Sequence, residues 1–225
     1  MMKPKIVFGI SALVLVAGFI IASSVYKSQR ARKLGFMAQE NASTFIKFHS
    51  PMLGDADAKV YIVKFTDPAC ETCASFSHFM KQWMAAYPGK IKLVIRYAPF
   101  HEGAADAVKV LIAAKKLGKF WETLDILYAT QAQWTQHHQV MVDRVWPLLA
   151  RAGLDVGAIQ SGMSDPEIDP IIEQDLADAR VLDVRKTPGI FVNGKPLDPF
   201  GAREFKELIE TELRANYPGL ALRRD

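Results

Sequence analysis

The sequence predicts an α/β domain with a mixed sheet and a long helical insertion, preceded by one N-terminal transmembrane helix. Two β-branched and aromatic segments, 59–66 and 91–97, enclose a stretch with helical spacing, which is typical of a strand–helix–strand unit. A further β segment at 189–197 comes only after about 80 residues of helical periodicity, and a final helix follows it. Strands on both sides of a helical block indicate an α/β arrangement.

Length and composition favour one folded domain with an appendage. The chain has 225 residues, of which 50% are hydrophobic and 23% charged. These values exclude disordered, collagen-like and disulfide-dense mini-proteins. Residues 1–33 carry six basic residues and no acidic one, whereas the remainder carries 22 basic and 24 acidic residues, so the net charge of +4 belongs to the N-terminus. We therefore expect no nucleic-acid partner.

The N-terminus contains a segment long enough to cross a membrane. Residues 6–26 are 21 residues without a charge, and as a helix they would span about 31 Å, close to the ~30 Å of a bilayer's hydrocarbon core. We expect an uncleaved, single-pass anchor in the inner (cytoplasmic) membrane. The alternatives are a signal peptide cleaved near Ala22-Ser23-Ser24 and a buried core helix. Basic residues lie on both sides, and a simple count under the positive-inside rule would keep the domain in the cytoplasm. That rule is weak when a whole domain follows the segment, so it does not decide the orientation.

Four regions follow one another along the chain. They are an anchor with basic flanks at 1–33, a polar spacer at 34–50, the α/β domain at 51–217 with its helical insertion at about 101–184, and a tail at 218–225.

The first elements of the domain are two strands and the helix between them. The strand segments Lys59–Thr66 and Ile91–Tyr97 are rich in β-branched and aromatic residues. Pro88-Gly89 ends the helix between them. Its apolar residues recur at helical spacing and are Phe76, Phe79, Met80, Trp83, Met84 and Tyr87.

The insertion is predicted to be helical throughout, from about 104 to 184. Asp165 is expected to cap a helix with Pro166 at its first position. Pro147 should break or kink the weaker segment before it. The apolar stripes lie at 104–112, 120–128 and 168–179.

A hairpin and a helix close the domain. Asn193-Gly194 favours a type I′ turn between strand segments at 189–192 and 195–197. Helical spacing then returns at Phe205, Leu208, Ile209 and Leu213.

The only two cysteines, Cys70 and Cys73, form a Cys-Glu-Thr-Cys motif between the first strand and the first helix. A helix N-terminus presents unpaired N–H groups and the positive end of the macrodipole, which lower the pKa of a thiol below its usual ~8.5. Cys73 lies one turn further and can close a disulfide with Cys70. We therefore expect Cys70 to be the exposed attacking thiol and Cys73 the resolving thiol.

A zinc half-site and a structural disulfide are the alternatives for this pair. Zinc needs four ligands, and the sequence has neither a second cysteine pair nor histidines at the spacing of a zinc finger. A structural disulfide would close a very short loop and stabilise little. We expect redox chemistry, with no metal and with no cofactor besides the Cys70–Cys73 disulfide.

Pro188 is a second unusual position, because it stands where the hairpin strand begins. Proline removes a hydrogen-bond donor from a sheet. The residues alone favour an ordinary trans turn at Thr187-Pro188, with a cis bond as the alternative.

Three motifs in this order resemble the thioredoxin superfamily, in particular its DsbA-like branch of bacterial thiol–disulfide oxidoreductases. The resemblance covers residues 50–215 approximately and implies a thioredoxin fold with a helical insertion. It also implies a cis peptide before Pro188 that faces the cysteines, and a Thr187–Pro188 loop that binds the substrate backbone as an added strand. The motifs are Gly54–Val60 leading into Lys64–Cys73, Gly118–Glu122, and Thr187–Leu197.

Two features depart from the better-known relatives. Glu71-Thr72 stands between the cysteines, where relatives often carry Pro followed by His, Tyr or Ser, and Lys64 stands six residues before Cys70, where many carry an acid. We expect Glu71, Thr72 and Lys64 to tune the redox potential. Lys64 would favour the thiolate if it lies beneath the cysteines, and would have no effect if it extends to solvent.

Together these features predict a membrane-tethered dithiol–disulfide oxidoreductase with its catalytic domain in the periplasm or outside the cell, where disulfides persist. Its expected partners are exported cysteine-containing proteins, a membrane or soluble redox partner, and the lipid bilayer through residues 6–26. The alternatives are a reductase or isomerase of the same fold, and a copper-binding chaperone that uses the two thiolates as soft ligands.

Overall fold

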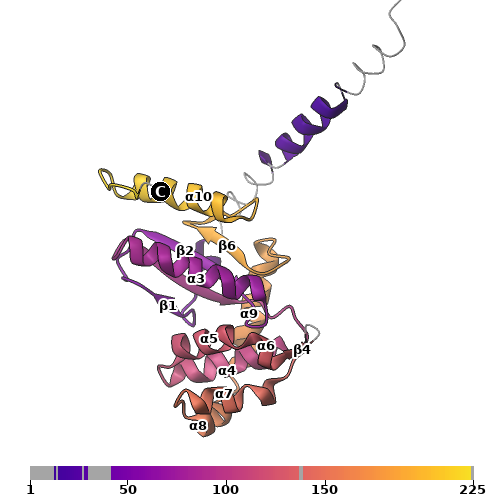
Figure 1. Ribbon diagram of the computed structural model, residues 1–225, viewed down its shortest axis with the longest axis vertical. Helices are drawn as coiled ribbons and strands as arrows, with labels where there is room; N and C mark the ends of the chain where they lie inside the picture. Colours follow the sequence, from indigo (N-terminus) through magenta and orange to yellow (C-terminus); the bar gives the residue numbers. More distant parts are fainter. Residues whose placement is uncertain (1–12, 14, 27, 30–41, 137–138, 224–225) are drawn as a thin grey trace, which may run out of the picture.

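The predicted strand–helix–strand unit forms the centre of the fold (Figure 1). β2 (Val60–Thr66) and β3 (Ile91–Tyr97) pair in parallel along their whole length, and α3 (Glu71–Ala86) connects them. Both strands are buried almost throughout, as expected for parallel strands covered on both faces. The computed structural model of this chain describes residues 13, 15–26, 28–29, 42–136 and 139–223.

The sheet is mixed, as the sequence predicts. β6 (Gly189–Val192) runs antiparallel to β2, and β7 (Lys195–Pro196) pairs with β6. Asn193 and Gly194 between them both have positive φ, 48° and 79°, as a type I′ turn requires. β1 (Met52–Leu53), a short strand that the sequence did not indicate, pairs antiparallel with β3, so that the strand order is β1-β3-β2-β6-β7.

Helices cover both faces of this sheet. α3 and α10 (Ala202–Asn216) pack on one face, where Phe205 lies in the main hydrophobic core. α9 (Ile168–Val181) and α2 (Ala42–Phe45) lie on the other face, which has a smaller apolar cluster around Phe45. Because side chains of a strand alternate between the faces, Lys64 and Ile62 project towards the side of α3.

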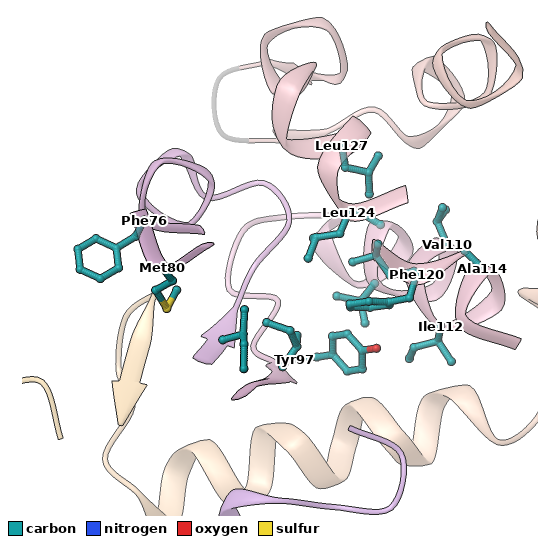
Figure 2. Close-up of a cluster of buried hydrophobic side chains, with 14 of the residues drawn as sticks. Phe76, Met80, Tyr97, Val110, Ile112, Ala114, Phe120, Leu124 and Leu127 are labelled. Carbon is teal, nitrogen blue, oxygen red and sulfur yellow. The ribbon is translucent and has the colours of Figure 1, made fainter. Parts of the chain in front are cut away.

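The helical insertion shares its core with the sheet. Buried side chains of its first two helices surround the Tyr97 ring of β3, which meets the Phe120 ring at 6.4 Å (Figure 2). Figure 1 shows the insertion gathered at one end of the folded domain and α10 at the other. Its elements are α4 (Ala104–Lys116), α5 (Phe120–Ala129), α6 (Gln131–Trp134), β4 (Thr135–Gln136), β5 (Gln139–Val140), a 3-10 helix (Val142–Arg144), α7 (Trp146–Arg151) and α8 (Val156–Gly162).

Two details of residues 101–184, the predicted insertion, differ from the prediction. β4 and β5 form a short antiparallel hairpin, so the insertion is not helical throughout. α9 begins at Ile168, because the Asp165 carboxylate accepts a hydrogen bond from the backbone N–H of Glu167 (2.9 Å) in a turn that precedes the helix. Pro147 lies at the start of α7, where its missing N–H leaves no hydrogen bond unmade.

Residues 42–50, which the sequence analysis assigned to the spacer, pack against the domain. Phe45 is 1% exposed, and its ring meets Phe191 edge-to-face at 5.0 Å. The carbonyl oxygens of Thr44 and Phe45 accept hydrogen bonds from the buried Arg96 guanidinium. The folded domain therefore includes this segment.

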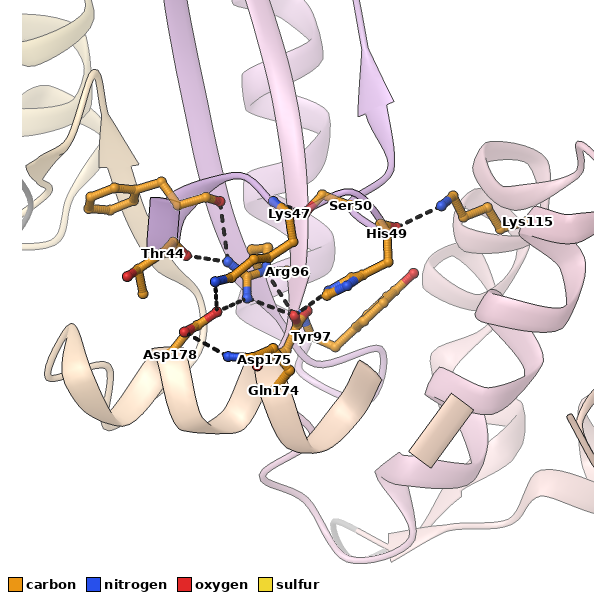
Figure 3. Close-up of polar contacts among 11 residues, drawn as sticks. Thr44, Lys47, His49, Ser50, Arg96, Tyr97, Lys115, Gln174, Asp175 and Asp178 are labelled. Carbon is orange, nitrogen blue, oxygen red and sulfur yellow. Dashed lines mark hydrogen bonds and ion pairs between the residues drawn. The ribbon is translucent and has the colours of Figure 1, made fainter. Parts of the chain in front are cut away.

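Arg96 is the centre of a buried ion cluster on the same face (Figure 3). Its guanidinium donates to Asp175 at 2.9 Å and 2.7 Å, and also to Asp178. Asp175 accepts a further hydrogen bond from the backbone N–H of Tyr97 (2.7 Å) and contacts His49 Nε2 at 2.5 Å. Since Arg96 and Asp175 are both 0% exposed, this pairing is what makes their burial tolerable.

The predicted membrane helix lies partly outside the described residues, which omit 1–12 and 14. Residues 15–26 are helical. In the part of the chain that the structure describes, no helix is both long and apolar enough to cross a membrane. The basic residues at 30–33 and the first part of the spacer, 34–41, also lie outside the described residues.

Candidate active site

Cys70 and Cys73 lie where β2 leads into α3. Cys70 is the N-cap residue of the helix, and its Sγ accepts a hydrogen bond from the backbone N–H of Cys73 at 3.2 Å. Without this bond the N–H would be one of the unpaired donors of a helix N-terminus. Both cysteines are free thiols in this structure. Cys70 is 6% exposed and Cys73 0%, so the attacking thiol is less accessible than we expected.

The two thiols differ in acidity. Hydrogen bonds lower the pKa of Cys70 from 9.0 to about 6, first that from the Cys73 thiol and then those from Thr187 and the Cys73 backbone, while burial and Asp67 oppose them. Burial raises the pKa of Cys73 well above 9.0, and its hydrogen bond to Cys70 adds to this effect. At neutral pH Cys70 is therefore the thiolate, which is the nucleophilic form.

The loop that enters β6 lies against Cys70. The peptide bond between Thr187 and Pro188 is cis, and Cys70 Sγ lies 3.5 Å from the Thr187 carbonyl oxygen. Pro188 is buried and Thr187 half-buried. The fold thus places together residues that are 117 positions apart in the sequence.

Lys64 lies beneath the cysteines and does not reach solvent. It is 0% exposed, and its Nζ donates to the Cys73 carbonyl oxygen at 2.7 Å and to the Tyr128 hydroxyl at 3.2 Å. Burial lowers the pKa of Lys64 from 10.5 to about 8, although the nearby cysteines oppose this shift. The positive charge in turn acts to lower the pKa of Cys73. Lys64 therefore faces the resolving thiol.

Glu71 and Thr72, the two residues between the cysteines, are exposed on the first turn of α3. Their effect on the redox potential stays a prediction.

Sequence reasoning missed a buried carboxylate next to Cys70. Asp67 follows β2 directly and is 0% exposed. It accepts hydrogen bonds from the backbone N–H groups of Ala69 (2.8 Å), Phe100 (2.7 Å) and His101 (2.9 Å), and His101 Nδ1 lies 2.8 Å from it. Asp67 thereby joins the loop before Cys70 to the loop after β3. The Asp-Pro step after a strand is a turn signal that could have indicated it.

The insertion supplies two further residues whose place at the site no local pattern indicates. The Gln131 side-chain amide donates to the carbonyl oxygens of Pro68 (2.6 Å) and Cys70 (3.1 Å). The Tyr128 hydroxyl lies 2.6 Å from Thr66 Oγ1 and beside Lys64 Nζ. Both therefore support the site from more than 60 positions away in the sequence.

Among the described residues, no group of three or more His, Cys, Asp or Glu side chains could hold a metal ion. The two cysteine sulfurs are potential soft ligands at the site.

Comparison with known proteins places the chain in a family. The sequence matches the thioredoxin family over residues 48–211. The chain belongs to the thioredoxin family. Among curated proteins it is similar to the probable disulfide bond formation protein D of Bacillus anthracis, at 23% identity over 223 residues that cover 95% of this chain and 97% of that protein. The predicted thioredoxin fold is thereby confirmed.

A relative of a different kind is a much longer protein. The chain is 27% identical over 162 residues to the Na(+)/H(+) antiporter NhaA of Herminiimonas arsenicoxydans, which covers 72% of this chain and 25% of the antiporter. This thioredoxin-family chain therefore spans about a quarter of the length of that relative.

Solved structures share the fold. Oxidised BdbD from Bacillus subtilis is 25% identical with a TM-score of 0.65, covering 74% of this chain and 94% of BdbD. A thioredoxin-like oxidoreductase from Silicibacter pomeroyi is 24% identical with a TM-score of 0.66, covering 76% and 96%. The thiol–disulfide exchange protein α-DsbA2 from Wolbachia pipientis is 18% identical with a TM-score of 0.68, covering 81% and 97%.

Proposed function

We propose that this chain is a thiol–disulfide oxidoreductase that exchanges disulfides with exported proteins through Cys70-Glu71-Thr72-Cys73. The observation that carries the proposal is the difference in acidity and burial between the two thiols. The pKa of Cys70 is lowered to about 6 at the start of a helix, and Cys73 lies fully buried one turn behind it. Similarity to the disulfide bond formation protein of B. anthracis and to BdbD supports the same activity.

The chemistry in the oxidising direction has two steps. A client thiolate attacks Cys70 Sγ of the Cys70–Cys73 disulfide, so that a mixed disulfide forms and Cys73 leaves with the electron pair. A second client thiolate then attacks the client sulfur, which forms the client disulfide and releases Cys70 as a thiolate. The lowered pKa of Cys70 favours this direction, because whatever stabilises the thiolate stabilises the reduced protein.

The reducing direction uses the same two residues and remains the alternative. Cys70 would attack a client disulfide, and Cys73 would resolve the mixed disulfide. Either direction needs a redox partner that re-oxidises or re-reduces the pair, and neither needs a cofactor beyond the disulfide itself.

Thr187 and Pro188 are proposed to hold the client backbone. The Thr187 carbonyl oxygen lies 3.5 Å from Cys70 Sγ, and Thr187 is only half-buried. A client that adds a strand beside this loop would form main-chain hydrogen bonds with its cysteine next to Cys70.

We also propose that residues 6–26 anchor the protein in the inner membrane as a single span, with the domain in the periplasm or outside the cell. Leu13, Leu15 and Phe19 are 73% to 75% exposed, although they are large and apolar. A bilayer would cover such side chains at a gain of about 25 cal/mol per Å².

The activity can be tested by equilibrating the protein with glutathione redox buffers and assaying oxidation of a reduced client peptide. Cys70 and Cys73 should pass between dithiol and disulfide, and Cys73→Ala should accumulate mixed disulfides through Cys70 because the resolving thiol is missing. An anaerobic titration with Cu(I) distinguishes the oxidoreductase from the alternative, a copper-binding chaperone. Stoichiometric Cu(I) binding without any thiol exchange would contradict the proposal and favour a copper chaperone.

A further inference from the structure

A cavity of about 570 Å³ opens between α4, α9 and the segment 42–50. It shares none of its described lining residues with the cysteines or with the Thr187–Pro188 loop. A volume of this size is typical of sites that bind small molecules. The apolar side chains that line the cavity are Phe48, Tyr97, Ile112, Pro166, Pro170 and Ile171.

The floor of this cavity contains a buried hydroxyl group without a partner. Tyr97 is 0% exposed, and its Oη makes no hydrogen bond within the part of the chain that the structure describes. Burial, together with Asp175, raises the pKa of Tyr97 well above 10.0, so the phenol keeps its proton and needs an acceptor. In Figure 3 the Tyr97 ring extends past His49 towards α4, the helix that carries Lys115.

Lys115 brings a positive charge to the same cavity. Its Nζ donates to the His49 carbonyl oxygen at 2.7 Å, so the described residues use one of its three N–H donors. No carboxylate in residues 42–136 or 139–223 forms an ion pair with it. Burial and the neighbouring Lys116 lower the pKa of Lys115, and an anion next to the amine would oppose this shift.

We propose that this cavity binds a small organic acid, whose carboxylate lies between Tyr97 Oη and Lys115 Nζ. The apolar part of the acid packs against Ile112 and Ile171. A carboxylate has two acceptor oxygens, so it can accept from the phenol and from the ammonium at the same time. This binding function goes beyond the proposed thiol–disulfide exchange and does not depend on it.

The charges around the cavity favour a monoanion with an apolar body. A single negative charge matches the Lys115 ammonium, whereas the carboxylates of Asp175 and Glu167 would oppose a dianion such as phosphate. Glu167 lies 3.5 Å from Lys116 Nζ, and its side chain is 78% exposed, so solvent screens its charge. The fully exposed Phe48 ring at the rim offers further apolar surface that a bound acid would cover.

Binding can be measured by isothermal titration calorimetry of the full chain in detergent, with 4-phenylbutyrate as the probe and protein-free detergent as the blank. We expect saturable binding with a Kd below about 1 mM, as for a small ligand of ordinary efficiency. The neutral analogue 4-phenylbutanamide has nearly the same shape but no charge. It should bind at least about tenfold more weakly, because a hydrogen bond to a charged group is stronger than one to a neutral group.

Two variants each remove one proposed partner of the carboxylate. Tyr97→Phe and Lys115→Met should weaken binding of 4-phenylbutyrate at least about tenfold, the effect of one lost hydrogen bond to a charged group. Tyr97→Phe deletes only a hydroxyl without a described partner, so it should not lower the Tm of the ligand-free protein. Lys115→Arg keeps the charge and should restore most of the affinity that Lys115→Met loses.

Matched controls are Tyr61→Phe on β2 and Lys109→Met on α4. Neither residue lines the cavity, and Lys109 is already paired with Asp169 at 2.7 Å. Both variants should bind the probe within about twofold of the wild-type protein, as expected for sites that share no partner with the ligand.

Absence of saturable binding to the wild-type protein, or equal affinity for the acid and the amide, would overturn the proposal. Unchanged affinity in both Tyr97→Phe and Lys115→Met would also overturn it, because the probe would then bind elsewhere. Exchange of Cys70 and Cys73 with glutathione should be the same in all these variants, so a failure of the proposed oxidoreductase function is a separate result.

Discussion

At the scale of single residues, hydrogen bonds rather than exposure decide the reactivity of Cys70. Cys70 is only 6% exposed, yet three hydrogen bonds act on its sulfur in the direction of the thiolate. We expect iodoacetamide to label Cys70 of the reduced protein with a rate that rises with pH and has its midpoint near 6. Peptide mass spectrometry after alkylation between pH 4 and 9 measures this.

Cys73 should stay unlabelled over the same pH range, because burial holds its pKa well above 9.0. The denatured protein is the control, and both cysteines should then react alike with a midpoint near the ordinary ~8.5. Faster labelling of Cys73 in the folded protein would show that the roles are reversed.

Lys64 should make the stability of the reduced protein depend on pH. Its pKa falls from 10.5 in the unfolded chain to about 8 in the fold. This shift corresponds to a free-energy cost of about 3 kcal/mol for burying the charged amine on folding. Below pH 8 Lys64 is charged in both states, so the cost of burying its charge is fully present. Between pH 8 and 10.5 the amine is neutral in the folded state but charged in the unfolded state, so the free energy of unfolding rises with pH. Above pH 10.5 Lys64 is neutral in both states and the cost is gone. The wild-type protein should therefore gain about 3 kcal/mol relative to Lys64→Met between pH 7 and 10.5.

Urea unfolding of both proteins under reducing conditions at these two pH values measures the gain. The comparison cancels the titration of groups that the two proteins share. An equal pH dependence in Lys64→Met and the wild-type protein would show that Lys64 stays charged and hydrated.

At the scale of elements, the segment 42–50 belongs to the domain because it completes the apolar cluster over one face of the sheet. Phe45→Ala should lower the free energy of unfolding by about 3–5 kcal/mol, as for other fully buried phenylalanines. Phe48, three residues later and fully exposed, is the matched control, and Phe48→Ala should leave stability unchanged within about 0.5 kcal/mol. Urea unfolding measures both, and equal stability of the two variants would show that the segment is not packed.

At the scale of the whole molecule, the N-terminal segment and the redox domain have to work in the same compartment. We expect a C-terminal reporter that is active only outside the cytoplasm to be active on the full chain, and the full-length protein to remain with membranes after alkaline extraction. Deletion of residues 1–33 should release the protein from the membrane fraction. A soluble mature chain that begins near Ser23 would show that the segment is a cleaved signal peptide.

The local elements could be predicted because their signals lie within a few residues of each other. The β-branched and aromatic residues in 59–66 and 91–97, the Asn193-Gly194 turn and the spacing of the α3 stripe each depend on short-range backbone geometry. The position of Cys70 at a helix N-terminus follows in the same way. The mixed α/β arrangement and the placement of the two cysteines could therefore be predicted from local patterns, whereas the thioredoxin fold itself was implied by the family resemblance.

The surroundings of that pair depended on the tertiary structure. Periodicity assigned Lys64 to one face of a strand, but whether that face was covered by solvent or by Tyr128, 64 positions later, is a property of packing. Arg96 and Asp175, 79 positions apart, became a buried ion pair only because α9 folds back over β3. Such contacts carry no local signature, because a buried charge is tolerated only when the fold delivers its partner. The nucleophile can thus be identified from the local sequence, whereas its environment is set by contacts between segments that are distant in the sequence.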